Sequence, residues 1–123
     1  MQSESSNSVK ITWLDRRQAI ENLRRSVSEL AAARPEIETV ILFGSLASGD
    51  AVPGSDADLL FILSDSDQPF SERIPHYIPS GCGIDVDVFP YTKKELEAML
   101  AAGNRFVREA LKQGLELFNR RSG

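Results

Sequence analysis

The apolar positions change their spacing along the chain, from a helical period at the start to short continuous runs afterwards. Between Asp15 and Pro35 they recur every three or four residues, which predicts an amphipathic helix that begins at a capping box and ends before the proline. Residues 39–43 are rich in β-branched and aromatic side chains and predict a strand. Residues 56–63 become continuously apolar after two acids, as in a central strand that is buried on both faces.

The second half of the chain predicts one more strand and two more helices. Residues 84–89 alternate apolar and acidic side chains up to Pro90, and this period of two is typical of a strand. A capping box begins a helix over residues 92–103, and a last helix is expected over residues 104–118. With a short helical turn at residues 45–48, this order predicts an α/β fold in which a small mixed β-sheet is backed by helices.

Length and composition indicate one ordinary globular domain. The chain has 123 residues, enough for a single modest core, and its 41% hydrophobic content is typical of soluble proteins. Residues 1–10 are polar and Ser-rich and lack a signal peptide's apolar core, so we expect a disordered lead-in followed by one domain over residues 11–123. No apolar run approaches the roughly 20 residues of a membrane span. The single cysteine, Cys82, excludes an internal disulfide and fits a reducing compartment, so a cytoplasmic location is expected.

The distribution of charge matters more than its sum. The net charge of −4 disfavours tight general binding to nucleic acid. Between Arg34 and Arg73 there is no lysine or arginine, although the span holds many acids. A polyphosphate bound there must therefore be met first by a metal ion and by backbone amides.

Candidate chemistry gathers around a turn between the first two strands. Gly44 and Ser45 follow the first strand and offer backbone amides and a hydroxyl, which suit a phosphate. Asp56 and Asp58 open the second strand and share a face, because side chains alternate with period two. Like charges held so close need a cation, and oxygen ligands suit Mg²⁺ or Mn²⁺. Each half alone has an ordinary explanation, as a glycine turn or as two surface acids, but together they indicate phosphoryl or nucleotidyl transfer.

A third carboxylate is expected from the third strand. Asp85 and Asp87 lie two residues apart and share a face, so strand alternation cannot choose between them. If this strand lies beside the second one, one of the two acids can join Asp56 and Asp58 around a metal pair. The other acid is expected on a solvated face.

The assembled pattern is Gly-Ser, roughly ten residues, Ser-Asp-x-Asp-Leu and a later Asp before Val-Phe-Pro-Tyr-Thr. It resembles the nucleotidyltransferase superfamily that includes DNA polymerase β, and within it the minimal nucleotidyltransferases of the MNT type. Those proteins are often encoded beside a helical HEPN partner as toxin–antitoxin pairs. The resemblance implies a polymerase β-like fold over a core from about residue 39 to residue 95.

The resemblance also implies a role for each matching residue. Asp56, Asp58 and Asp87 would bind the metals, and Asp87 would help to activate the attacking hydroxyl. The nucleotide would be held at three positions of the turn and the following loop, which are Gly44, Ser45 and Ser55. Ser55 is expected to act as a turn hydroxyl and not as a reactant.

The implied function is transfer of a nucleoside monophosphate, with AMP from ATP as the first candidate, to a hydroxyl of a protein partner or a small molecule. The cofactor would be Mg²⁺ or Mn²⁺, and the chain would be the antitoxin-like half of a HEPN/MNT pair. Two alternatives stay open, a non-catalytic subunit that neutralises a partner by binding and a subunit that supplies half of a larger transferase. The full set of acids favours the enzyme. Ser48, where many small members carry arginine, favours the non-catalytic subunit, and the acceptor, the base and the oligomeric state stay open.

Overall fold

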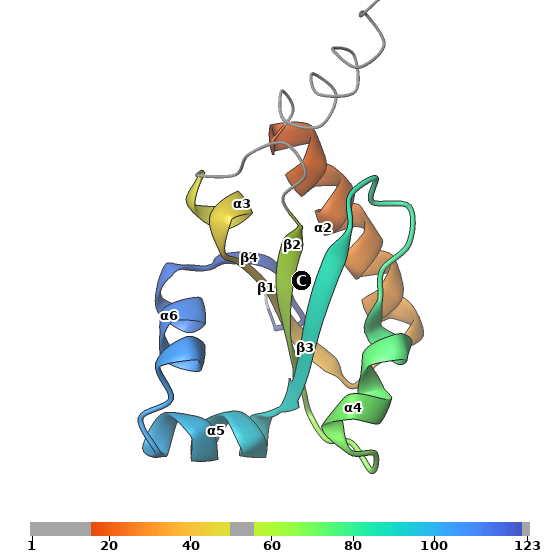
Figure 1. Cartoon of the computed structure of the whole chain (residues 1–123). Helices are drawn as coiled ribbons and strands as arrows, with labels where there is room; N and C mark the ends of the chain where they lie inside the picture. The colour runs from red at the N-terminus through yellow and green to blue at the C-terminus, as the bar shows by residue number, and fades with distance from the viewer. Residues whose placement is uncertain (1–15, 50–55, 122–123) are drawn as a thin grey trace, which may run out of the picture.

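A computed structural model of the chain describes residues 16–49 and 56–121 (Figure 1). The expected lead-in over residues 1–10, Asp15 of the first capping box, and Ser55 lie outside these described residues. Within the described part, one sheet has helices packed on both of its faces (Figure 1).

The sheet has four strands in the order β3-β2-β1-β4. Their bounds are β1 Ile37–Phe43, β2 Ala57–Leu63, β3 Val86–Thr92 and β4 Leu115–Asn119. β1 pairs antiparallel with both β2 and β4, whereas β2 and β3 run parallel. The expected small mixed sheet backed by helices is therefore confirmed, with one strand more than the sequence indicated.

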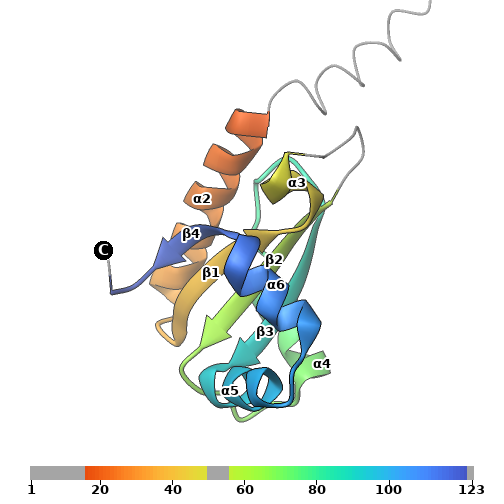
Figure 2. The same ribbon diagram turned by 90° about the vertical axis from the view of Figure 1, so that its left-hand side faces the viewer.

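The helices divide between the two faces of the sheet. Their bounds are α2 Arg16–Ala33, α3 Ser45–Ser48, α4 Phe70–Arg73, the 3₁₀ turn η1 Ile74–Tyr77, α5 Lys93–Ala101 and α6 Arg105–Gln113. α2 packs on one face, while α5 and α6 pack on the other (Figure 2). None of the helices in the described ranges has both the length and the apolarity needed to cross a membrane.

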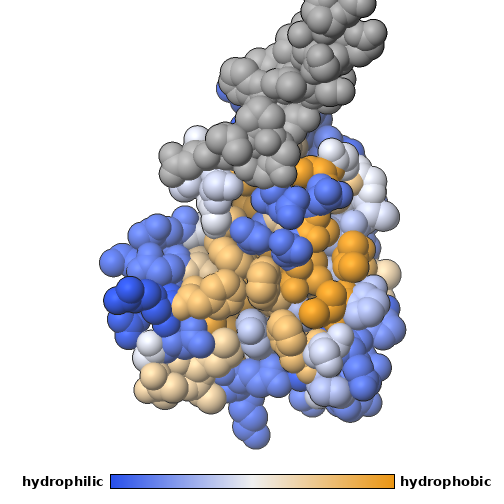
Figure 3. Space-filling view, viewed as in Figure 1, coloured by the Kyte–Doolittle hydropathy of each residue, from blue (hydrophilic) through white to orange (hydrophobic). Residues whose placement is uncertain are grey.

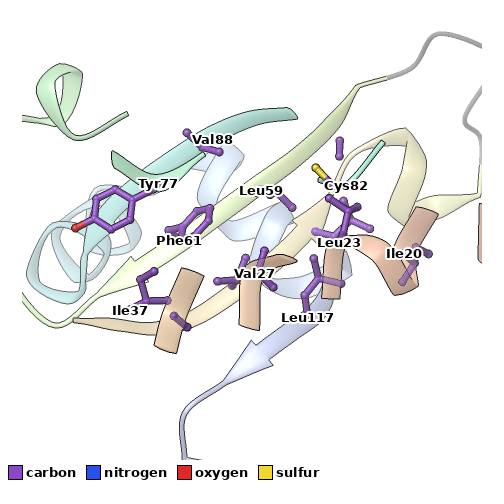
Figure 4. Packing of buried hydrophobic residues seen from close by; sticks show 14 of the residues in the cluster. Ile20, Leu23, Val27, Ile37, Leu59, Phe61, Tyr77, Cys82, Val88 and Leu117 are labelled. Atoms are coloured by element: carbon purple, nitrogen blue, oxygen red, sulfur yellow. The ribbon is translucent and has the colours of Figure 1, made fainter. Parts of the chain in front are cut away.

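Alternation along β2 explains why this strand is buried on both faces. Leu59 and Phe61 join Val27 of α2 in the larger apolar cluster (Figure 4). Leu60 is one position out of phase and packs against Val107 of α6 in a second cluster. All five side chains are fully buried, as the continuous apolar run in the sequence predicted.

The predicted last helix over residues 104–118 is wrong in its second half. α6 ends at Gln113, and the following residues form β4 along the edge of β1. Gly114 allows this change, because a Cβ there would overlap the Ala110 carbonyl oxygen and the Ile41 side chain. Apolar residues keep a helical spacing on both sides of this glycine. Residues 115–119 nevertheless form a strand, because they pair with β1.

The third strand was expected to end at Pro90 but continues to Thr92. Proline lacks the N–H of a strand residue, so it is tolerated on an edge strand. β3 is such an edge strand, with β2 on one side. Pro90 is also fully buried, and its carbonyl accepts a hydrogen bond from Arg73 at 2.9 Å.

Arg73 of α4 forms hydrogen bonds to the loop before α4, to β3 and to α5. Arg73 is only 3% exposed, and its side chain donates to the Gln68 carbonyl at 2.8 Å in addition to Pro90. It also donates to both carboxylate oxygens of Glu95, at 2.7 and 2.8 Å. Glu95 accepts the N–H of Thr92 at 2.9 Å in the capping box that begins α5. The bonded guanidinium lowers the pKa of Glu95 to about 2.

The free energy of unfolding is expected to fall as the pH is lowered from about 4.5 towards 2. Glu95 titrates near 4.5 when unfolded and near 2 when folded, so its contribution is present above 4.5 and is lost as the pH falls through the folded value. Arg73→Met should lower the free energy of unfolding at pH 7 by about 2 kcal/mol and flatten this acid dependence. Urea unfolding at several pH values measures both effects. Glu97→Gln, an exposed change on α5, should keep the parent's slope, and an unchanged slope in Arg73→Met would contradict the assignment.

Candidate active site

Strand register brings two of the predicted acids side by side. Asp58 of β2 is the direct partner of Asp87 in parallel β3, and it is also the partner of Phe43 in antiparallel β1. Neighbouring strands lie about 4.8 Å apart, and paired residues point to the same face. This face is the one on which α5 and α6 pack, because Leu60, Ile62 and Phe89 continue the same alternation.

The charges of Asp56, Asp58 and Asp87 act on one another. Asp56 lies directly before β2 and is exposed, as is Asp87, whereas Asp58 is half-buried. The pKa of Asp58 is raised, first because burial removes its carboxylate from water and then because of the negative charges of Asp87 and Asp56. The negative charges of three carboxylates are therefore gathered at this end of the sheet.

Asp85 is placed differently from Asp87. Its backbone carbonyl accepts a hydrogen bond from the N–H of Ala57 at 2.9 Å, and its side chain is exposed. It lies before the first residue of β3, and it is not among the charges that raise the pKa of Asp58. Geometry therefore favours Asp87 as the third carboxylate.

Gly44 lies against the carboxylate of Asp58. Its φ of 81° is in the region that favours glycine, and a Cβ built on it would overlap Asp58 Oδ2. This close approach explains the glycine at the end of β1 better than a turn requirement alone. The backbone at Gly44, where the sequence predicted a phosphate, therefore lies directly beside Asp58.

Arginine reaches α3 from another part of the chain. Arg16, in the first turn of α2, donates to the carbonyl oxygens of Leu46 and Ala47 at 2.8 Å each. The next residue, Ser48, is exposed, and its hydroxyl donates to the Ser45 carbonyl at 3.2 Å. Positive charge therefore lies beside α3, although Ser48 itself carries none.

The donor set of these acids fits a hard divalent cation. Aspartate oxygens alone suit Mg²⁺ or Mn²⁺, and the mutual repulsion of the carboxylates would be relieved by such an ion. Within the described ranges, no three carboxylate, imidazole or thiol groups form a ready-made metal cage. The fit therefore rests on the kind of donors and on their charge.

Aromatic residues beside the acids were not singled out from the sequence. Ring centroids of Phe43, Phe89 and Phe106 lie 5.2 to 5.5 Å apart in a triangle on the same face. Phe43 precedes Gly44, and Phe89 lies two residues after Asp87, so strand alternation could have placed both. Phe106 comes from α6, and its position depends on helix packing that no local pattern indicates.

A family model described as the nucleotidyltransferase domain matches residues 20–117, from α2 to β4. The chain belongs to the nucleotidyltransferase domain family. The match spans Gly44, Ser45 and all three acids, and it confirms the resemblance that the motif indicated. A search of curated proteins finds no significant match to this nucleotidyltransferase domain.

Three solved structures are similar to this nucleotidyltransferase domain to different degrees. A candidate nucleotidyltransferase from Sulfolobus solfataricus superposes with a TM-score of 0.64 at 22% identity, over 89% of this chain and 87% of that chain. A toxin–antitoxin structure with AMP-PNP matches with a TM-score of 0.49 at 19% identity, over 78% and 73% of the two chains. A mutant of the toxin–antitoxin MntA-HpeT matches with a TM-score of 0.47 at 16% identity, over 78% and 72%. The first of these confirms the polymerase β-like fold.

Proposed function

We propose that this nucleotidyltransferase domain transfers AMP from ATP to a hydroxyl group, with Asp56, Asp58 and Asp87 as metal ligands. The observation that carries the proposal is the pairing of Asp58 with Asp87 in adjacent strands, directly against Gly44. Membership of the nucleotidyltransferase domain family supports the class of reaction, and the three acids are the residues that would bind the metal ion. An Mg²⁺ or Mn²⁺ ion held there would neutralise the phosphates and lower the pKa of the acceptor hydroxyl.

The residues of the chain would divide the work by position. The backbone at Gly44 and Ser45 would hold the triphosphate against the acids, and Ser55 stays a predicted nucleotide-binding residue. The acceptor oxygen would form a bond to the α-phosphorus while the bond to the leaving pyrophosphate breaks. Asp87 would receive the proton of the acceptor hydroxyl, since it is exposed to solvent at the edge strand and can reach an incoming group.

We propose a separate protein as the acceptor, in the manner that the MNT resemblance implies for a helical HEPN partner. Asp56 and Asp87 are both exposed to solvent. Such an open site can receive a group presented by another molecule. The stretch without basic residues between Arg34 and Arg73 supports a protein or small-molecule acceptor over nucleic acid.

Incubation with α-labelled ATP, Mg²⁺ and a lysate of the source cells tests this proposal. A discrete labelled protein band is expected, and Asp58→Asn should remove it. Label that appears only in small molecules, and that disappears with Asp58→Asn, would reject the protein acceptor but keep the transferase. Equal labelling by parent and Asp58→Asn would reject the transferase assignment itself.

A second candidate function is a non-catalytic subunit that acts by covering a partner. The neutral Ser48 favours it, because the resemblance implies an arginine there in many small members. Arg16 weakens this alternative, since it already brings a guanidinium to α3. Partner binding without any incorporation of label would support the non-catalytic subunit.

A further inference from the structure

A pocket of about 390 Å³ opens between α3 and α6, within the range of roughly 300–1,000 Å³ that small-molecule sites occupy. Apolar surface lies in the middle of this side of the molecule, with hydrophilic surface next to it (Figure 3). The pocket is lined by Phe43, Gly44 and Ser48 from the strand and turn, and by Phe106, Glu109, Ala110 and Gln113 from α6.

This pocket adjoins the proposed site without containing its acids. It shares Gly44 with that site, and Gly44 lies against the Asp58 carboxylate. It also shares Phe43, which is the β1 partner of Asp58. A nucleotide whose phosphates lie at Gly44 and the acids would therefore have its base within reach of the pocket.

The pocket offers an aromatic surface to a flat ligand. Phe106 is 39% exposed, although it packs edge-on against Phe43 with an angle of 83° between the rings. Phe89 supports Phe106 from β3, with ring centroids 5.2 Å apart. A large aromatic ring left this open beside a polar site can stack with a nucleobase, and such stacking tolerates any base.

The polar lining narrows the choice of base. Glu109 and Gln113 are four residues apart on α6, so both lie on the face that lines the pocket. Within the described ranges, neither side chain makes a hydrogen bond or an ion pair. An ionised glutamate only accepts, whereas a glutamine amide both donates and accepts, which matches an amino group beside a ring nitrogen. A glutamine paired with adenine in two hydrogen bonds is the usual form of this recognition.

We propose that this pocket holds the adenine base of the substrate nucleotide. Adenine stacks on Phe106, its amino group donates to Gln113 and Glu109, and the Gln113 amide donates to a ring nitrogen. The inference rests on the proposed function and adds to it a base subsite and a reason for the choice of ATP. In this proposal α6 binds the base, whereas the acids and the Gly-Ser turn bind the metal ion and the phosphates.

Calorimetric titration of the full chain with Mn²⁺ and ATP, GTP, UTP or inorganic tripolyphosphate tests the base subsite. ATP is expected to bind about tenfold more tightly than tripolyphosphate, and Phe106→Ala should remove that difference. Gln113→Glu should lower the preference for ATP over GTP about tenfold, because a carboxylate repels the adenine ring nitrogen and accepts from guanine. Neither change should alter the affinity for tripolyphosphate.

A matched control is available on the same helix. Leu111 is 37% exposed, a fraction similar to the 39% of Phe106, but it does not line the pocket. Leu111→Ala should therefore bind ATP as the parent does. If all three nucleotides bind alike, and Phe106→Ala binds ATP as the parent does, the base subsite is rejected while the transferase proposal stands. If neither ATP nor tripolyphosphate shows metal-dependent binding, the proposed function is rejected as well.

Discussion

Asp58→Asn is expected to lower Mg²⁺-dependent transfer of AMP about a thousandfold. Asp58 is the central member of the row of acids formed by Asp56, Asp58 and Asp87. It is paired with Asp87 in β3 and lies against Gly44. Loss of its charge removes a ligand from the proposed metal site, and metal ions supply several kcal/mol of transition-state stabilisation. Release of labelled pyrophosphate at a saturating ATP concentration measures the effect.

The same variant should be at least as stable as the parent when metal is absent. Burial and two neighbouring negative charges raise the pKa of Asp58, so folding makes its charged form less favourable than it is in the unfolded chain. Thermal unfolding should show an unchanged or higher midpoint for Asp58→Asn, and Mn²⁺ should stabilise the parent but not Asp58→Asn. Asp67→Asn, an exposed acid away from the row, is the matched control and should behave as the parent in both assays. An inactive and strongly destabilised Asp58→Asn would mean that this side chain is structural.

Asp87→Asn is expected to lower transfer about a hundredfold, whereas Asp85→Asn should stay close to the parent's rate. Both acids are exposed and belong to the same end of β3, so they form a matched pair. Only Asp87 is in register with Asp58 and raises its pKa. The ratio of the two single-turnover rates measures the difference. An inactive Asp85→Asn beside an active Asp87→Asn would reverse the assignment of the third carboxylate.

Local sequence patterns predicted the helices and strands in which apolar residues recur with one regular spacing. α2, β1, β2 and the capping box of α5 follow from apolar spacing and from cap residues, and each lies within a few residues of its expected position. β4 could not be predicted in this way. Its residues carry a spacing that suits a helix, and only the open edge of β1 and the tight approach at Gly114 make them a strand.

The acids of the site could be found from the sequence, but their arrangement could not. Alternation placed Asp56 with Asp58 and Asp85 with Asp87, yet the choice within the second pair depends on the register between β2 and β3. That register is a long-range property, because 22 residues separate Leu63 from Val86. The sequence did not indicate the pocket residues of α6 for the same reason. Phe106, Glu109 and Gln113 lie near Gly44 only because α6 packs on the sheet.

Calorimetric titration of ATP in the presence and absence of Mn²⁺ tests the central claim most directly. The comparison is between the parent and a variant that combines Asp56→Asn with Asp58→Asn, with both proteins checked for cooperative unfolding. ATP is expected to bind the parent only when Mn²⁺ is present, and the metal-dependent part should be absent from the double variant. Equal binding of Mn²⁺ and ATP by parent and double variant would contradict the claim that these carboxylates form the metal site of the transferase.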